Sequence, residues 1–135
     1  MGTCDANLKP EGTRAVGAVV APDRARITVF LNEANSERTL ANLAVNPRAA
    51  ICFTRPIDHR TVQVKGRVLT VRRTLDSEKP RLDRYLSAFV EALYLVGVTR
   101  ATGGRIAYWP SMAVEITVED LFLATPGPGA GGRLS

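Results

Sequence analysis

The order of elements is decided in the stretch Ile27–Gly66, where the chain reads ITVFLNEANSERTLANLAVNPRAAICFTRPIDHRTVQVKG. The apolar and β-branched run Ile27–Leu31 predicts a strand. Ala49–Thr54 is almost continuously apolar and predicts a second strand, which we expect to be buried on both faces. Between them, Ser36–Asn46 has the spacing of a short helix, and Thr61–Val71 alternates like a strand with one polar face. The stretch therefore predicts strand, helix, strand and strand.

The first turn of the predicted helix has the composition of an anion-binding site. Asn35–Thr39 combine a cap residue, two hydroxyls and a guanidinium where backbone N–H groups are unpaired and the helix dipole is positive. We therefore expect Ser36, Arg38 and Thr39 to hold an anionic group such as a phosphate. Two interpretations without a ligand stay open. In the first, Ser36 and Thr39 are ordinary capping residues. In the second, Arg38 is a solvated side chain that the helix dipole disfavours by about 0.3–1 kcal/mol.

The flanking sequence adds strands and a longer helix. Arg14–Val20 predicts a strand that a hairpin joins to Arg26–Leu31, and Met112–Val118 predicts the last strand. Apolar residues at helical spacing predict that Leu75–Val98 is mostly helical. Several strands with two interposed helices and short connections favour an α+β fold that is mainly β: an antiparallel β-barrel with helices packed outside.

The chain length and both ends indicate a single domain. A chain of 135 residues is long enough to bury one hydrophobic core. Residues 1–13 are polar and turn-rich, and we interpret them as an N-terminal extension. Residues 125–135 form a Gly- and Pro-rich tail that we expect to lack regular structure. Within the strand Thr61–Val71, Gly66 predicts a bulge.

Composition disfavours several classes of function. The net charge is +5, but the basic residues are scattered and aromatic residues are few, which argues against nucleic-acid binding. No apolar run reaches the roughly 18 residues of a membrane span, and the first residues lack a secretory signal, which predicts a cytoplasmic protein. His59 is the only histidine, and Cys52 lies within an apolar run as a small hydrophobe, so no metal site is expected.

Five segments follow one another in the order typical of one protein family. They are Thr13–Val16, Phe30–Leu31, Ser36–Leu43, Asn46–Arg48 and Arg60–Gly66. In this order the chain resembles the pyridoxamine 5′-phosphate oxidase-like proteins, which are FMN-binding split β-barrels. The two ends of the chain resemble a branch of small proteins in that family without an assigned reaction. The resemblance implies a split-barrel fold, bound FMN, and a homodimer in which each flavin site is shared between two chains.

The resemblance also implies a set of cofactor-binding residues. They are Arg14, Ala15 and Val16 along the flavin, Phe30 and Leu31 on the next strand, Ser36, Arg38 and Thr39 around the phosphate, and Thr61 and Gln63 near the ring. Arg38 matches the phosphate-binding arginine of the family, and Thr39 stands where a lysine often follows it. Thr61 stands where many members have a glutamine, which Gln63 on the same strand face is able to replace.

Departures from the family pattern argue against true pyridoxamine phosphate oxidation. Ala124 stands where many relatives have Trp or Gln against the flavin, and the tail lacks the Arg-x-His pair that holds the oxidase substrate. We therefore expect an FMN-dependent oxidoreductase acting on an unknown small substrate, with no catalytic side chain assigned. The alternative is a non-catalytic split-barrel protein that binds flavin, deazaflavin or haem. We expect His59 to have a structural or solvent-facing role. We expect Trp109 to fill the core or a dimer interface, and the alternative is that it covers the ligand.

Overall fold

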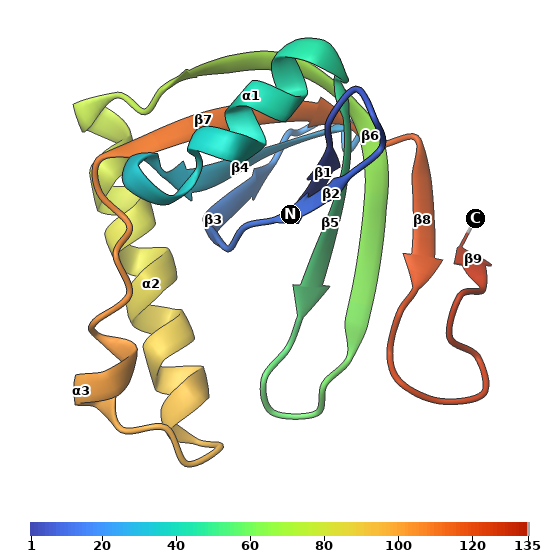
Figure 1. Ribbon diagram of the computed structural model, residues 1–135. Helices are drawn as coiled ribbons and strands as arrows, with labels where there is room; N and C mark the ends of the chain where they lie inside the picture. The colour runs from blue at the N-terminus through green and yellow to red at the C-terminus, as the bar shows by residue number, and fades with distance from the viewer. Residues whose placement is uncertain (135) are drawn as a thin grey trace.

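The computed structural model describes residues 1–134 as one antiparallel sheet with helices against its outside (Figure 1). The strands are β1 (Gly2–Cys4), β2 (Pro10–Gly12), β3 (Ala15–Val20), β4 (Arg26–Asn32), β5 (Arg48–Thr54), β6 (Thr61–Arg73), β7 (Ser111–Thr117), β8 (Asp120–Leu123) and β9 (Arg133–Leu134). The helices are α1 (Glu37–Val45), α2 (Lys79–Tyr94) and α3 (Arg100–Gly103), with 3₁₀ turns η1 (Glu33–Asn35) and η2 (Asp76–Glu78). The predicted mainly β, antiparallel fold class with outer helices is confirmed, although the sheet is not closed.

The sheet runs in the order β2-β1-β5-β6-β7-β4-β3, and β8 pairs with β6 and β9. β3 therefore forms one edge of the sheet. β5 pairs with β1 only at Ala50, opposite Gly2. Residues 51–54 of β5 are therefore paired with β6 on one side and form a second free edge on the other. The barrel is split between these two edges. One helix, α2, packs beside β3 and continues past the sheet toward α3 (Figure 1).

Strands β4 and β7 are buried on both faces, and this divides the core into two parts. They pair along their whole length, and Ile27, Val29 and Leu31 point with their β7 neighbours into the barrel. The alternate residue Phe30 points the other way and packs with Leu82 of α2. Because each fully buried aliphatic side chain contributes about 1.5–3 kcal/mol, this double burial fixes the register of the central strands and the position of α2.

A close backbone crossing explains Gly66. β7 and β8 lie along the same edge of β6, and the chain passes from one to the other beside Gly66. A Cβ on Gly66 would overlap the carbonyl oxygen of Thr117, so only glycine fits there. The predicted bulge at Gly66 is wrong, since Gly66 pairs in register with Ala49 and the register shift lies between Val68 and Thr70.

Three other expectations need correction. The N-terminal extension is not only turns: it forms the β1–β2 hairpin, which its polar composition conceals. The tail contains the two-residue strand β9, which pairs with β8, while Ser135 lies outside the described residues. β5 is not buried on both faces, because Cys52 is exposed. Cys4 and Cys52 are both free thiols. Among residues 1–134, no helix combines the length and apolarity needed to span a membrane.

Candidate functional site

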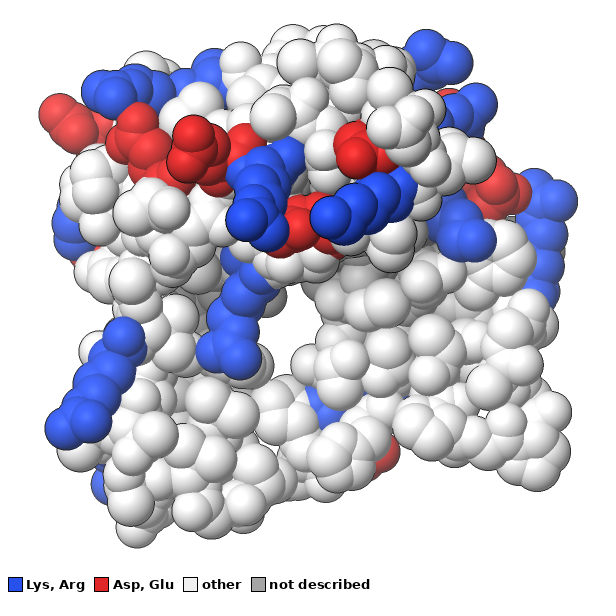
Figure 2. Space-filling view, in the orientation of Figure 1, with Lys and Arg blue, Asp and Glu red and all other residues white. Residues whose placement is uncertain are grey.

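The split in the barrel opens into a cleft of about 610 Å³, which we call the central cleft. One wall comes from β3 and α2, and the other from β5 and the start of β6. Figure 2 shows the opening between the lobe formed by α2 and α3 and the β5–β6 hairpin. Its volume is in the range of sites that hold a cofactor or a drug-sized ligand.

Arg14 lies where the central cleft meets two smaller cavities. A cavity of about 360 Å³ lies between Arg14 and α2, and another of about 260 Å³ lies between Arg14, Asn32 and Asn35. Its guanidinium has neither an ion-pair partner nor a hydrogen bond within residues 1–134. A free guanidinium at the junction of three cavities is suited to bind a phosphate in two-pronged geometry.

Asn32 provides an unusual second group at this junction. The residue is only 6% exposed, and its Oδ1 is buried without a hydrogen-bond partner among residues 1–134. Buried acceptors without a partner are rare in folded proteins because the lost hydrogen bond costs about 1–3 kcal/mol. Asn32 is also one of the residues that line the 260 Å³ cavity, although Oδ1 itself is buried.

Two aromatic side chains of α2 form the apolar wall of the central cleft. Tyr85 and Phe89 are four residues apart and therefore lie on the same helix face. Burial raises the pKa of the Tyr85 phenol above its ordinary value of 10, so the hydroxyl stays protonated at neutral pH and keeps its donor. The pair offers a flat apolar surface with one hydrogen-bond donor, which suits a planar ring system.

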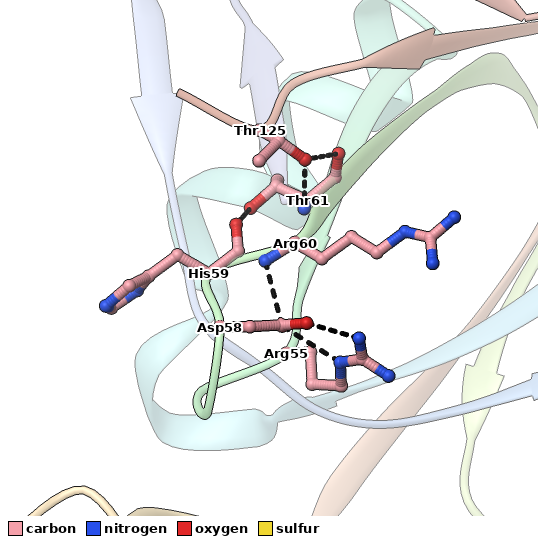
Figure 3. Close-up of polar contacts among 6 residues, drawn as sticks. All are labelled: Arg55, Asp58, His59, Arg60, Thr61 and Thr125. Carbon is pink, nitrogen blue, oxygen red and sulfur yellow. Dashed lines mark hydrogen bonds and ion pairs between the residues drawn. The ribbon is translucent and has the colours of Figure 1, made fainter. Parts of the chain in front are cut away.

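The opposite wall includes the loop between β5 and β6 (Figure 3). Arg55 forms a two-pronged ion pair with Asp58, with Nε 2.9 Å from Oδ1. The Arg60 backbone N–H also donates to Asp58, at 3.2 Å, while its guanidinium points away from that carboxylate (Figure 3). Thr61 anchors the loop, because its Oγ1 donates to the His59 carbonyl at 2.9 Å and its N–H donates to Thr125.

The structure brings only part of the predicted cofactor set to the central cleft and the cavities beside it. Arg14 and Ala15 line the central cleft, and Val16 lines both smaller cavities. Phe30 and Leu31 are 2% and 0% exposed and belong to the two core clusters behind β3. Their side chains do not line the central cleft.

The helix N-terminus that was expected to bind phosphate has a different environment. Ser36 and Thr39 are buried, with the Ser36 hydroxyl donating to the Glu33 carbonyl at 3.2 Å. Arg38 is highly exposed, lies 4.0 Å from Glu11, and lines a separate cavity that also contains Asp5. These three residues are outside the central cleft in a single chain.

The residues expected near the flavin ring lie around the loop end of the β5–β6 hairpin. Thr61 is buried and shares a hydroxyl contact of 3.0 Å with Thr54, which lines the central cleft. Gln63 reaches the Cys52 sulfur at 3.5 Å, and the Ala124 N–H donates to the Thr61 carbonyl at 2.9 Å. Trp109 packs against the core cluster under α2, as the core interpretation predicts.

Several residues around the central cleft were not singled out from the sequence: Asn32, Arg55, Arg60, Tyr85 and Phe89. The spacing of Tyr85 and Phe89 does indicate a shared helix face, but that pattern equally describes a helix packed on a core. No sequence signal shows that Asn32 lacks a partner, since hydrogen bonding at this position depends on residues far away in the chain.

Comparison with known proteins agrees with this architecture. HupZ from Group A Streptococcus is similar at 20% identity and a TM-score of 0.51, covering 96% of this chain and 86% of that one. A solved FMN-binding protein from Syntrophomonas wolfei is similar at 12% identity and a TM-score of 0.52, covering 89% of this chain and 71% of that one. No curated protein sequence matches this chain significantly.

The structural similarities have low sequence identity and show a shared fold alone. The family evidence comes from the sequence model described as pyridoxamine 5′-phosphate oxidase, which matches residues 1–119. That match spans most of the 135 residues and includes both walls of the central cleft. The chain therefore belongs to the pyridoxamine 5′-phosphate oxidase family.

Proposed function

We propose that this chain is a flavoprotein that binds FMN non-covalently in the central cleft and serves as an oxidoreductase for a small substrate. The observation that carries the proposal is the junction at Arg14, where Arg14 and Asn32 line the same cavity and neither the guanidinium nor the buried Oδ1 has a partner among residues 1–134. The Arg14 guanidinium is suited to a phosphate, and Asn32 Oδ1 is suited to a hydroxyl or N–H donor of a flavin nucleotide. Family membership and a solved relative that is an FMN-binding protein support the proposal.

Each part of the site has a separate role in the proposal. Arg14 neutralises the phosphate, and Asn32 accepts a hydrogen bond from the ligand. Tyr85 and Phe89 cover the ring system and exclude water from one side, with the Tyr85 phenol available as a donor. FMN, when bound, supplies one- and two-electron redox chemistry, and the protein supplies binding, orientation and a dry surface.

The contacts implied by the family for Ser36, Arg38, Thr39, Thr61 and Gln63 remain proposals. Arg38 would reach a phosphate only after leaving Glu11, an ion pair that is exposed and therefore weak. Thr61 and Gln63 would contact the ligand from the loop end of the hairpin, beside Thr54 and Cys52 of the central cleft.

We also propose that the protein is a homodimer in which each flavin site is shared between two chains. The end of α2 and the turn after it support this, because the consecutive residues Tyr94, Leu95 and Val96 are 47%, 70% and 45% exposed. Apolar side chains that gather at the surface often belong to a protein–protein interface. Sedimentation velocity at micromolar concentration is expected to give twice the mass of the 14.6 kDa chain.

A visible absorption spectrum of the freshly purified protein, followed by titration with FMN, tests the main proposal. We expect flavin bands in the purified protein, or saturable quenching of FMN fluorescence after the cofactor has been removed. Bands of haem or of a deazaflavin would instead assign a different cofactor to the central cleft. Colourless protein that leaves FMN fluorescence unchanged would refute the proposal.

A further inference from the structure

The central cleft has a charge pattern that a flavin phosphate alone does not explain. Three arginines line it, with Arg14 on the β3 side and Arg55 and Arg60 on the β5–β6 side. Within the described chain, no Asp or Glu side chain lines this cleft. Most acidic residues on the face shown in Figure 2 gather above the opening, around α1 and β2. Clefts lined by one sign of charge concentrate ligands of the opposite sign.

Asp58 distinguishes the two arginines of the β5–β6 loop. Both oxygens of its carboxylate are engaged by Arg55, and the Arg55 guanidinium is the largest cause that lowers the Asp58 pKa to about 2. Asp58 therefore stays ionised and neutralises Arg55. Arg60 donates its backbone N–H to Asp58 at 3.2 Å, and its positive charge is the smallest contribution that lowers the Asp58 pKa. The Arg60 guanidinium has no ion-pair partner among residues 1–134.

The loop holds Arg60 in place although the loop is exposed. The Arg55 N–H donates to the Arg60 carbonyl and the His59 N–H donates to the Arg55 carbonyl, both at 2.9 Å. His59 has φ of +56°, a left-handed conformation that costs a non-glycine residue about 1 kcal/mol or more. These contacts leave the Arg60 side chain free beside the central cleft (Figure 3).

We propose that Arg60 binds the carboxylate or phosphate of a small organic anion that occupies the central cleft beside the flavin. The inference rests on the proposed function, in which Arg14 is engaged by the FMN phosphate. The two arginines line opposite walls of the cleft, and the proposal assigns a separate anion to each. Arg24 and Arg67 also have no ion-pair partner in the part of the chain that the structure describes, but neither lines a cavity described above, which sets Arg60 apart from a merely solvated arginine.

Isothermal titration calorimetry with three probes tests the assignment: benzoate, phenyl phosphate and the uncharged benzamide. Each is titrated into FMN-loaded protein and into flavin-free protein. Arg60→Gln is expected to weaken benzoate and phenyl phosphate by about tenfold, the loss of one charge-assisted contact. Benzamide binding should not change. Arg60→Lys, which keeps the charge but not the planar fork, should recover part of the loss.

Arg67→Gln is the matched control, because it removes the same charge from an exposed position on β6, the strand that follows Arg60, and leaves the central cleft intact. The inference is overturned if benzoate and benzamide bind equally, or if Arg60→Gln binds both anions as the wild type does. Absence of FMN binding to the wild type would instead overturn the proposed function. The flavin-free titrations would still decide the role of Arg60.

Discussion

Two regions of this protein carry an arginine among polar side chains, and their environments are opposite. At the start of α1, Arg38 is close to Glu11, and the neighbouring hydroxyls of Ser36 and Thr39 are buried. At the junction beside β3, Arg14 has no carboxylate partner among residues 1–134 and lines a cavity together with Asn32. The comparison shows that residue types describe a possible anion site, whereas competing charges and access decide whether it is available.

The largest expected effect comes from Arg14→Gln. Removal of its guanidinium should weaken FMN binding by roughly 10- to 100-fold, about 1.5–3 kcal/mol for a charge-assisted hydrogen bond. Quenching of FMN fluorescence measures the dissociation constant directly. Arg67→Gln serves as the control with the same change in net charge. Unchanged FMN affinity in Arg14→Gln would show that Arg14 does not bind the FMN phosphate.

Asn32→Ala separates a role in binding from a role in folding. Because Oδ1 has no partner among the residues that the structure describes, its removal should change the free energy of unfolding of the flavin-free form by less than about 1 kcal/mol. FMN affinity should fall roughly fivefold, since about 1 kcal/mol is lost with the ligand's hydrogen bond. Chemical denaturation and FMN titration measure the two quantities. A large loss of stability with unchanged affinity would contradict the binding role.

Arg38→Gln is expected to have a smaller effect than either change. Since Arg38 lies with Glu11 outside the central cleft, FMN affinity should change less than about twofold, the scale of an exposed ion pair. Glu11→Gln, which frees Arg38, is the complementary variant. A tenfold loss in Arg38→Gln, or tighter FMN binding in Glu11→Gln, would favour the phosphate role implied by the family resemblance.

The smallest expected effect is a local response of the β5–β6 loop to pH. The Asp58 pKa is lowered from 3.8 to about 2, chiefly by Arg55, so its stabilising contribution is complete above pH 4. The contribution is lost as the pH falls from about 4 to 2, when the carboxylate takes up a proton. The Arg60 amide resonance in NMR spectra should follow this titration. Asp58→Asn should abolish it, and a midpoint near 4 in the wild type would contradict the ion pair.

The fold was largely predictable because its central elements have strong periodicity. Ile27, Val29 and Leu31 alternate as a strand, and the β4–β7 pairing confirms this pattern. The β1–β2 hairpin was missed because its strands have three residues each and a polar composition. Cys52 was misplaced because the apolar run in β5 does not show that one edge and one face of the strand border the central cleft.

The candidate site was predictable only in part. Arg14, Ala15 and Val16 were proposed from the family resemblance, and the structure places all three beside the cavities. The aromatic wall of Tyr85 and Phe89 was missed because helical spacing alone does not distinguish a core face from a cleft wall.

By itself, the sequence determined the central strands, the two longer helices and the antiparallel class, because side-chain alternation and helical spacing are local properties. Only the tertiary structure decided that Arg14 is free, that Arg38 is close to Glu11, and that Asp58 neutralises Arg55 while leaving Arg60 available. The availability of a charge depends on which distant residues surround it and on its access to solvent. Those relationships arise only when β3, α2 and the β5–β6 hairpin come together around the central cleft.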